Sequence, residues 1–121
     1  MALSSRSKGQ YYEAMAEQHL HRHGLVTIEK NFTIKGGEID LIMQDNKTIV
    51  FIEVRYRASK QYGHAASTVT QAKANKIFAT ANFWLMKQGL SAYNCDLRFD
   101  LVAIHQHGEQ IEWFKNALTQ G

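Results

Sequence analysis

The sequence predicts a single α/β domain with a central mixed β-sheet flanked by helices. Helical periodicity gives way to strand-like runs, returns once, and gives way to strand-like runs again, which is typical of helices packed against a sheet. The 121 residues are enough for one domain with one hydrophobic core. Since the chain contains no proline and no low-complexity tract, we interpret residues 1–121 as one unit, with residues 1–7 and the loop near residues 57–67 as its irregular parts.

The first helix is predicted over residues 8–23. Ala16 and Leu20 recur at helical spacing, and Gly24 follows where a helix is expected to end. Residues 26–28 and 32–34 then change to strand-like composition and predict one strand, continuous or broken.

The next residues predict a β-hairpin. Its strands are expected at residues 38–43 and 48–56, with the turn at residues 45–47. Gly36 and Gly37 precede the first strand and permit a bend or bulge there.

The remaining chain predicts one more helix and two more strands. Residues 68–71, Thr-Val-Thr-Gln, have the form of a capping box, so a helix is expected from there to about Lys87, before Gly89. Strands are expected at residues 97–104 and 110–114, joined by a turn. Asp100 lies inside the first of these apolar strands, and we expect it to have a hydrogen-bonded structural role.

Composition narrows the class of protein. Cys95 is the one cysteine, so no intrachain disulfide can form, which favours a reducing compartment. The sequence has no run of about 18 apolar residues, and we predict a cytoplasmic protein with no membrane partner. The formal charge of +3 favours a polyanionic partner such as nucleic acid.

Asp40 and Glu53 each lie within an apolar, strand-like run. An ionised carboxylate is costly there unless a cation or hydrogen bonds compensate it. A hairpin turn centred between residues 45 and 46, or between residues 46 and 47, puts both acids on one side of the sheet. In the second register they are directly opposite, with Cβ atoms roughly 5 Å apart. Two such carboxylates repel each other unless a divalent cation lies between them, and their oxygen ligands suit Mg²⁺ or Mn²⁺.

Arg55 follows Glu53 on the same face of its strand. Two acids and a permanent cation in one place match the electrostatic needs of phosphoryl transfer, which predicts a metal-dependent phosphodiester hydrolase. The alternative is that the acids pair with Arg55 or Arg57 at a strand edge, as surface ion pairs often do.

An acidic residue followed by a strand with the pattern Glu-x-Lys resembles the PD-(D/E)xK nuclease superfamily, which includes restriction endonucleases and Holliday-junction resolvases. Over about residues 8–115 the chain is more specifically similar to the YraN-like family of small bacterial proteins. The shared motifs are Lys8-Gly9, Glu13-Ala14, Asn31-Phe32, residues 37–42, residues 51–57, Gly63 with Ala65, and residues 98–104. The resemblance implies a restriction-endonuclease-like core and a nuclease or nucleic-acid-binding role.

The resemblance also implies roles for individual residues. Asp40 and Glu53 would hold the metal, and the backbone carbonyl of Val54 would complete its inner shell. Glu13 would lie beside the metal, directly or through water. Arg55 stands where the superfamily has its lysine; because an arginine stays protonated, it could only orient water or stabilise charge.

Further residues are predicted around this site. Glu38 shares a strand face with Asp40 and is expected to be an outer ligand of second rank. The residues expected to contact nucleic acid are Tyr56, Arg57, Gln71, Lys73 and Lys76. For the lysines, the alternative is an ordinary solvated helix face.

The predicted function is Mg²⁺- or Mn²⁺-dependent hydrolysis of DNA, including branched or structured DNA, with Arg55 stabilising the charge that develops on the phosphate. One alternative is a non-catalytic nucleic-acid-binding module in which the arginine has ended turnover. Another is a small interaction protein whose acids and arginines only pair. Many nucleases of this type act as homodimers, but no segment of this sequence predicts an interface.

Overall fold

The computed structural model describes residues 5–57, 69–105 and 110–119. Within these residues, two helices and five strands follow one another in the predicted order, and the α/β architecture with a restriction-endonuclease-like core is confirmed. The elements are α1 (Ser5–His21), β1 (Val26–Ile34), β2 (Gly37–Asp45), β3 (Thr48–Arg57), α2 (Gln71–Lys87), β4 (Leu97–His105) and β5 (Gln110–Leu118).

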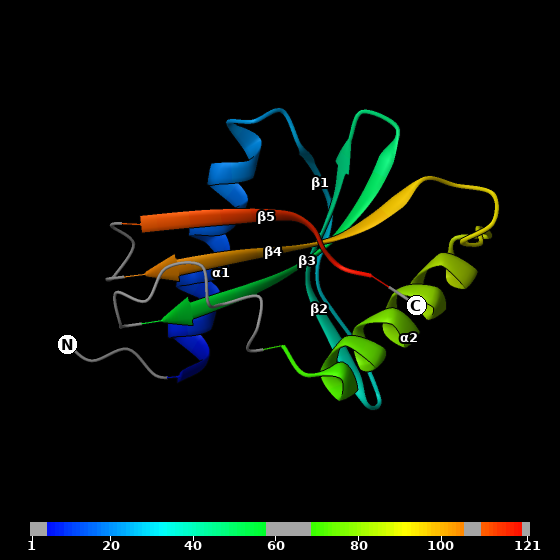
Figure 1. Cartoon of the computed structure of the whole chain (residues 1–121), viewed down its shortest axis with the longest axis horizontal. Coiled ribbons are helices and arrows are strands. Elements are labelled where there is room, and N and C mark those ends of the chain that lie inside the picture. The colour runs from blue at the N-terminus through cyan, green and yellow to red at the C-terminus, as the bar shows by residue number, and fades with distance from the viewer. Residues whose placement is uncertain (1–4, 58–68, 106–109, 120–121) are drawn as a thin grey trace.

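The five strands form one mixed sheet in the order β1-β2-β3-β4-β5. β3 and β4 are parallel, and the other neighbouring pairs are antiparallel. Parallel neighbours need a long crossover connection, and α2 lies between β3 and β4 in the chain. In Figure 1, α1 crosses behind β3 and β4, whereas α2 runs beside β2.

The two helices pack on opposite faces of the sheet. In β3, Val50 and Ile52 belong to the buried cluster of α1, whereas Phe51 belongs to that of α2, because neighbouring strand residues point to opposite faces. The helix residues in these clusters follow the spacing of one helix face. They are Tyr12, Ala16 and Leu20 in α1, and Ala74, Ile77, Phe78, Ala81, Trp84 and Leu85 in α2. Each large apolar side chain buried there contributes about 1.5–3 kcal/mol.

The first helix begins earlier than predicted. α1 already includes residues 5–7, which were expected to be irregular. The described residues do not include residues 1–4 or residues 58–68. Nearly all of the loop expected near residues 57–67 falls in the second of these ranges.

The second helix is capped by a different threonine from the predicted one. The N-cap of α2 is Thr70, whose side-chain oxygen accepts a hydrogen bond from the N–H of Lys73 at 3.1 Å. The predicted capping box required Gln71 in the third helical position, but Gln71 opens the helix and its amide donates to Asn75 at 2.8 Å. Thr68 lies outside the described residues.

β1 is continuous, although two irregularities interrupt its regular pairing. Its register with β2 shifts between Thr27 and Glu29, and Asn31 has a left-handed backbone with φ of 54°. Asparagine tolerates this conformation better than most residues. β2 pairs with β3 so that the turn is centred between Asn46 and Lys47, which is the second of the two predicted registers.

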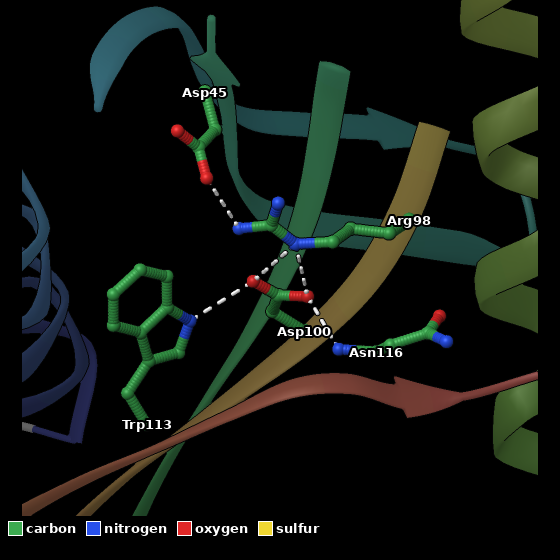
Figure 2. A network of polar contacts seen from close by, with 5 residues as sticks. All are labelled: Asp45, Arg98, Asp100, Trp113 and Asn116. Atoms are coloured by element: carbon green, nitrogen blue, oxygen red, sulfur yellow. Dashed lines mark hydrogen bonds and ion pairs between the residues drawn. The ribbon is translucent and has the colours of Figure 1, made fainter. Parts of the chain in front are cut away.

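β5 extends past its predicted end at residue 114, and a buried acid holds the added residues (Figure 2). Asp100 of β4 is fully buried. Its carboxylate accepts hydrogen bonds from Arg98 Nε at 3.0 and 3.1 Å, from Trp113 Nε1 at 2.9 Å and from the N–H of Asn116 at 2.8 Å. Asn116 has a φ of 54° and lies where the β4–β5 register shifts. The hydrogen-bonded structural role predicted for Asp100 is confirmed.

Candidate active site

β2 and β3 separate at Asp40 and Glu53. Their paired stretch ends with Leu41 opposite Ile52, and the same register sets Asp40 opposite Glu53. Beyond that point the N–H of Val54 donates to Asp40 Oδ2 at 2.9 Å. A carboxylate oxygen therefore takes the place of a backbone carbonyl where the two strands part.

The direction of β2 changes at the same position. Ile39 packs with the α2 cluster and Leu41 with the α1 cluster, although strict alternation would place residues two apart on one face. Asp40 lies between them, is 9% exposed, and points toward Val54 on β3. The irregular backbone thus turns a carboxylate into the gap between the strands.

Three acids share this location. Burial, followed by hydrogen bonding with Glu53 and repulsion from its charge, raises the pKa of Asp40 to about 9. Burial also raises the pKa of Glu13, while hydrogen bonds with Asp40 and Asn31 partly oppose that rise. Glu13 of α1 and Glu53 of β3 are therefore joined through Asp40, which keeps its proton at neutral pH.

Lys73 brings a cation to Glu53 from α2. Its Nζ lies 3.0 Å from Glu53 Oε2. This buried oxygen has no hydrogen-bond partner within the described residues, so the contact is close in distance but lacks hydrogen-bond alignment. Arg55 Nε is likewise buried without a hydrogen-bond partner in the part of the chain that the structure describes.

These side chains line one cavity of about 630 Å³ between α1, the separated strands and the first turns of α2. Most of the predicted site residues line its wall. They are Glu13, Glu38, Asp40, Glu53, Val54, Arg55, Tyr56, Lys73 and Lys76.

Two predicted nucleic-acid contacts do not line the cavity. Arg57 follows Tyr56 on β3 and donates from Nη1 to the carbonyl of Tyr56 at 3.0 Å. Gln71 is exposed and pairs with Asn75 on the surface of α2. The structure therefore brings the acids and two lysines together, and leaves Arg57 and Gln71 outside the cavity wall.

Sequence reasoning missed several residues of the cavity. Lys8 and Tyr12 of α1 line it, and so does Thr70. Tyr12 stacks on Tyr56 with ring centroids 4.0 Å apart, and burial raises its pKa to about 12. Helical spacing places Lys8 and Tyr12 on one face of the helix, but it does not link them to Glu13, which follows Tyr12 directly.

The donor set suits a hard divalent cation. Asp40 and Glu53 lie within hydrogen-bonding reach of each other, and the buried Oε2 of Glu53 makes no hydrogen bond among the described residues, although it forms an ion pair with Lys73. Because the N–H and C=O of one strand residue face the same neighbouring strand, the carbonyl of Val54 is directed to the β2 side with its N–H. Mg²⁺ typically uses one or two protein carboxylates and completes its shell with water and phosphate. Among the described residues, no group of three or more His, Cys, Asp and Glu is arranged to hold an ion by itself.

The fold and the cavity define a class: an α/β protein with a restriction-endonuclease-like core and an acidic site where two central strands separate. A family model described as "Uncharacterised protein family UPF0102" matches residues 12–104, and the chain belongs to this family, which includes the YraN-like proteins.

Curated relatives match nearly the whole chain. A UPF0102 protein of Vibrio vulnificus is 53% identical over 118 residues, covering 98% of this chain and 97% of the relative. One of Aliivibrio salmonicida is 52% identical with 98% and 96% covered, and one of Vibrio cholerae is 46% identical with 98% of each covered. Within the described residues, neither helix has the length and apolar character needed to span a membrane.

Proposed function

We propose that this protein is a Mg²⁺- or Mn²⁺-dependent nuclease that hydrolyses phosphodiester bonds of DNA in the cytoplasm, with branched or structured DNA as the substrate class. The observation that carries the proposal is the pair of Asp40, which is buried, and Glu53, which is partly buried: the two acids are hydrogen-bonded where β2 and β3 separate, and Asp40 is linked to Glu13. The restriction-endonuclease-like core supports it, because acids at these positions hold the metal in the superfamily that the chain resembles.

The reaction is hydrolysis. The oxygen of a water molecule forms a bond to phosphorus while the bond from phosphorus to one sugar oxygen breaks. The sugar oxygen leaves with the electron pair and gains a proton, and the water gives up one. When bound, Mg²⁺ or Mn²⁺ polarises the water and neutralises charge on the phosphate.

The chain's own groups divide the remaining work. Asp40, Glu53 and the carbonyl of Val54 would hold the ion, and Glu13 holds Asp40 from α1. Arg55 offers a permanent positive charge inside the cavity, where developing negative charge is stabilised more strongly than in water. Lys8 and Lys76 on the cavity wall attract the DNA backbone.

The first test is cleavage of end-labelled single-stranded, duplex, flapped and four-way-junction DNA in Mg²⁺ or Mn²⁺. Asp40→Asn removes the charge but keeps an oxygen that can accept from Val54. Asp96→Asn makes the same chemical change at an exposed residue outside the cavity wall. We expect the wild type and Asp96→Asn to cleave DNA. The cleavage rate of Asp40→Asn should be lower by at least about 100-fold.

Equal cleavage by all three proteins would identify a contaminating nuclease and contradict the proposal.

Cleavage of both strands of a duplex is expected of a homodimer. Light scattering of the same samples with DNA measures the molar mass of the complex and so tests for a homodimer.

The second candidate is a non-catalytic nucleic-acid-binding module, and the presence of Arg55 in the lysine position favours it. It predicts DNA binding without cleavage by the wild type. Arg55→Lys separates the two candidates, because a gain of cleavage in this variant would identify a site that has lost turnover through the arginine.

A further inference from the structure

Lys73 lies where helix electrostatics disfavour it. α2 begins at Gln71, and the N–H of Lys73 is bound by the N-cap Thr70 in the first turn. The N-terminus of a helix carries partial positive charge and favours acidic residues, yet this first turn contains none. A residue that violates a local rule is expected at functional sites, so the position calls for a role beyond helix formation.

The ammonium of Lys73 is directed into the acidic site. Its Nζ is 3.0 Å from Glu53 Oε2, in a pair in which the Glu53 side chain is 10% exposed and the Lys73 side chain 45% exposed. Within the described residues this buried oxygen makes no hydrogen bond, so Lys73 meets Glu53 as an ion pair. An ammonium has three N–H donors, and a contact with one oxygen leaves donors for a second partner.

Arg55 does not offer the same geometry. It follows Glu53 by two residues on β3, and its Nε is buried without a hydrogen-bond partner in the described residues. A guanidinium is a rigid planar fork, whereas an ammonium is a compact charge with three donors on a flexible stem. Lys73 reaches the same cavity from a different element, α2.

Building on the nuclease function proposed above, we propose that Lys73 is a catalytic residue which supplies from α2 the lysine function that β3 lacks. Its ammonium donates hydrogen bonds to a non-bridging oxygen of the scissile phosphate as negative charge develops there. It neither gives up nor gains a proton in the step. Glu53 positions it between turnovers.

The test compares Lys73→Met and Lys73→Arg with Lys87→Met, which removes a lysine from the other end of the same helix. Single-turnover cleavage at saturating protein gives the rate of the chemical step, and DNA binding in EDTA gives the Kd. Circular dichroism and thermal unfolding establish that each variant is folded. Asp40→Asn is included to test the nuclease function itself.

We expect Lys73→Met to slow the chemical step by at least about 100-fold while the Kd for DNA changes by less than about threefold. Lys73→Arg should recover at least about tenfold over Lys73→Met, because it restores a cation within reach. Lys87→Met should match the wild type in both measurements.

If Lys73→Met cleaves DNA at a rate within about threefold of the wild type, Lys73 forms only a surface ion pair and this inference is wrong. A loss of cleavage in Asp40→Asn would still support the nuclease function in that case. A wild type that binds DNA but cleaves none of the substrates would overturn both. The two failures are thus distinguishable in one set of measurements.

Discussion

Burial, and after it the hydrogen bond with Glu53 and the repulsion from its charge, raises the pKa of Asp40 so that its carboxyl is protonated at neutral pH. Its pKa of about 9 is far above the ordinary value of about 3.9 for aspartate. A divalent cation would have to displace this proton, since metal ligands bind in their deprotonated form. The residue that anchors the proposed metal site is therefore also a source of pH-dependent stability.

In EDTA, the Asp40→Asn variant should lose a component of pH-dependent stability. Below about pH 4 the carboxyl is protonated in both the folded and the unfolded chain, so its stabilising contribution is fully present. As the pH rises toward 9, the folded chain keeps a proton that the unfolded chain releases, and the contribution falls by about 1.4 kcal/mol per pH unit. Asparagine cannot titrate. Urea unfolding between pH 5 and 8 should show the free energy of unfolding of the variant increasing relative to that of the wild type as the pH rises. Parallel curves of unfolding free energy against pH would contradict the expectation.

At the scale of elements, the cavity exists because α2 is packed closely against the start of β2. A Cβ built on Gly37 would lie 2.0 Å from Thr80 Oγ1 and 3.4 Å from the carbonyl oxygen of Lys76. Thr80 is itself buried and donates to that carbonyl at 2.7 Å. Only a glycine lets the helix approach this closely, and the approach carries Lys73 and Lys76 to the wall of the acidic site.

Gly37→Ala should therefore destabilise the protein by about 1–3 kcal/mol, because the added methyl group has no space. Combining it with Thr80→Ala should recover part of the loss, since the closest clashing atom is removed. Gly9→Ala is the matched control: a Cβ there meets nothing within 4 Å, and the change in the interior of α1 should stabilise by about 0.5–1 kcal/mol. Urea denaturation of the wild type and these three variants measures the differences. Equal stability of Gly37→Ala and the wild type would show that the helix can shift away.

At the scale of the whole molecule, the sequence predicts the features that depend on residues close together along the chain. The hairpin register follows from the alternation of apolar residues around a short turn, so the register and the closeness of Asp40 to Glu53 could be predicted. The position of Tyr12 against Tyr56 could not, because it depends on how α1 lies across the sheet. The Lys73 contact with Glu53 likewise depends on the packing of α2.

The end of β5 illustrates the same limit. Its last residues show no regular strand pattern in the sequence, and a hydrogen bond from Asn116 to a buried carboxylate on β4 fixes them. Periodicity cannot reveal such a contact, although an aspartate in an apolar run did indicate that some hydrogen-bonding partners had to exist.

The charge distribution of the whole molecule leads to a prediction for DNA binding. The net charge of +3 gives a modest overall attraction, so Lys8 and Lys76 on the cavity wall should supply most of the phosphate contacts. If Lys8 and Lys76 each neutralise a phosphate, Lys8→Gln and Lys76→Gln should each reduce the slope of log K against log salt by about 0.9 on duplex DNA and about 0.7 on single strands. Lys47→Gln, in the turn that joins β2 and β3 away from the separated strand ends, makes the same change in net charge and should leave the slope unaltered. Fluorescence anisotropy titrations at several salt concentrations measure the slopes. An equal decrease in all three variants would mean that DNA responds to the overall charge of the molecule and not to this cavity.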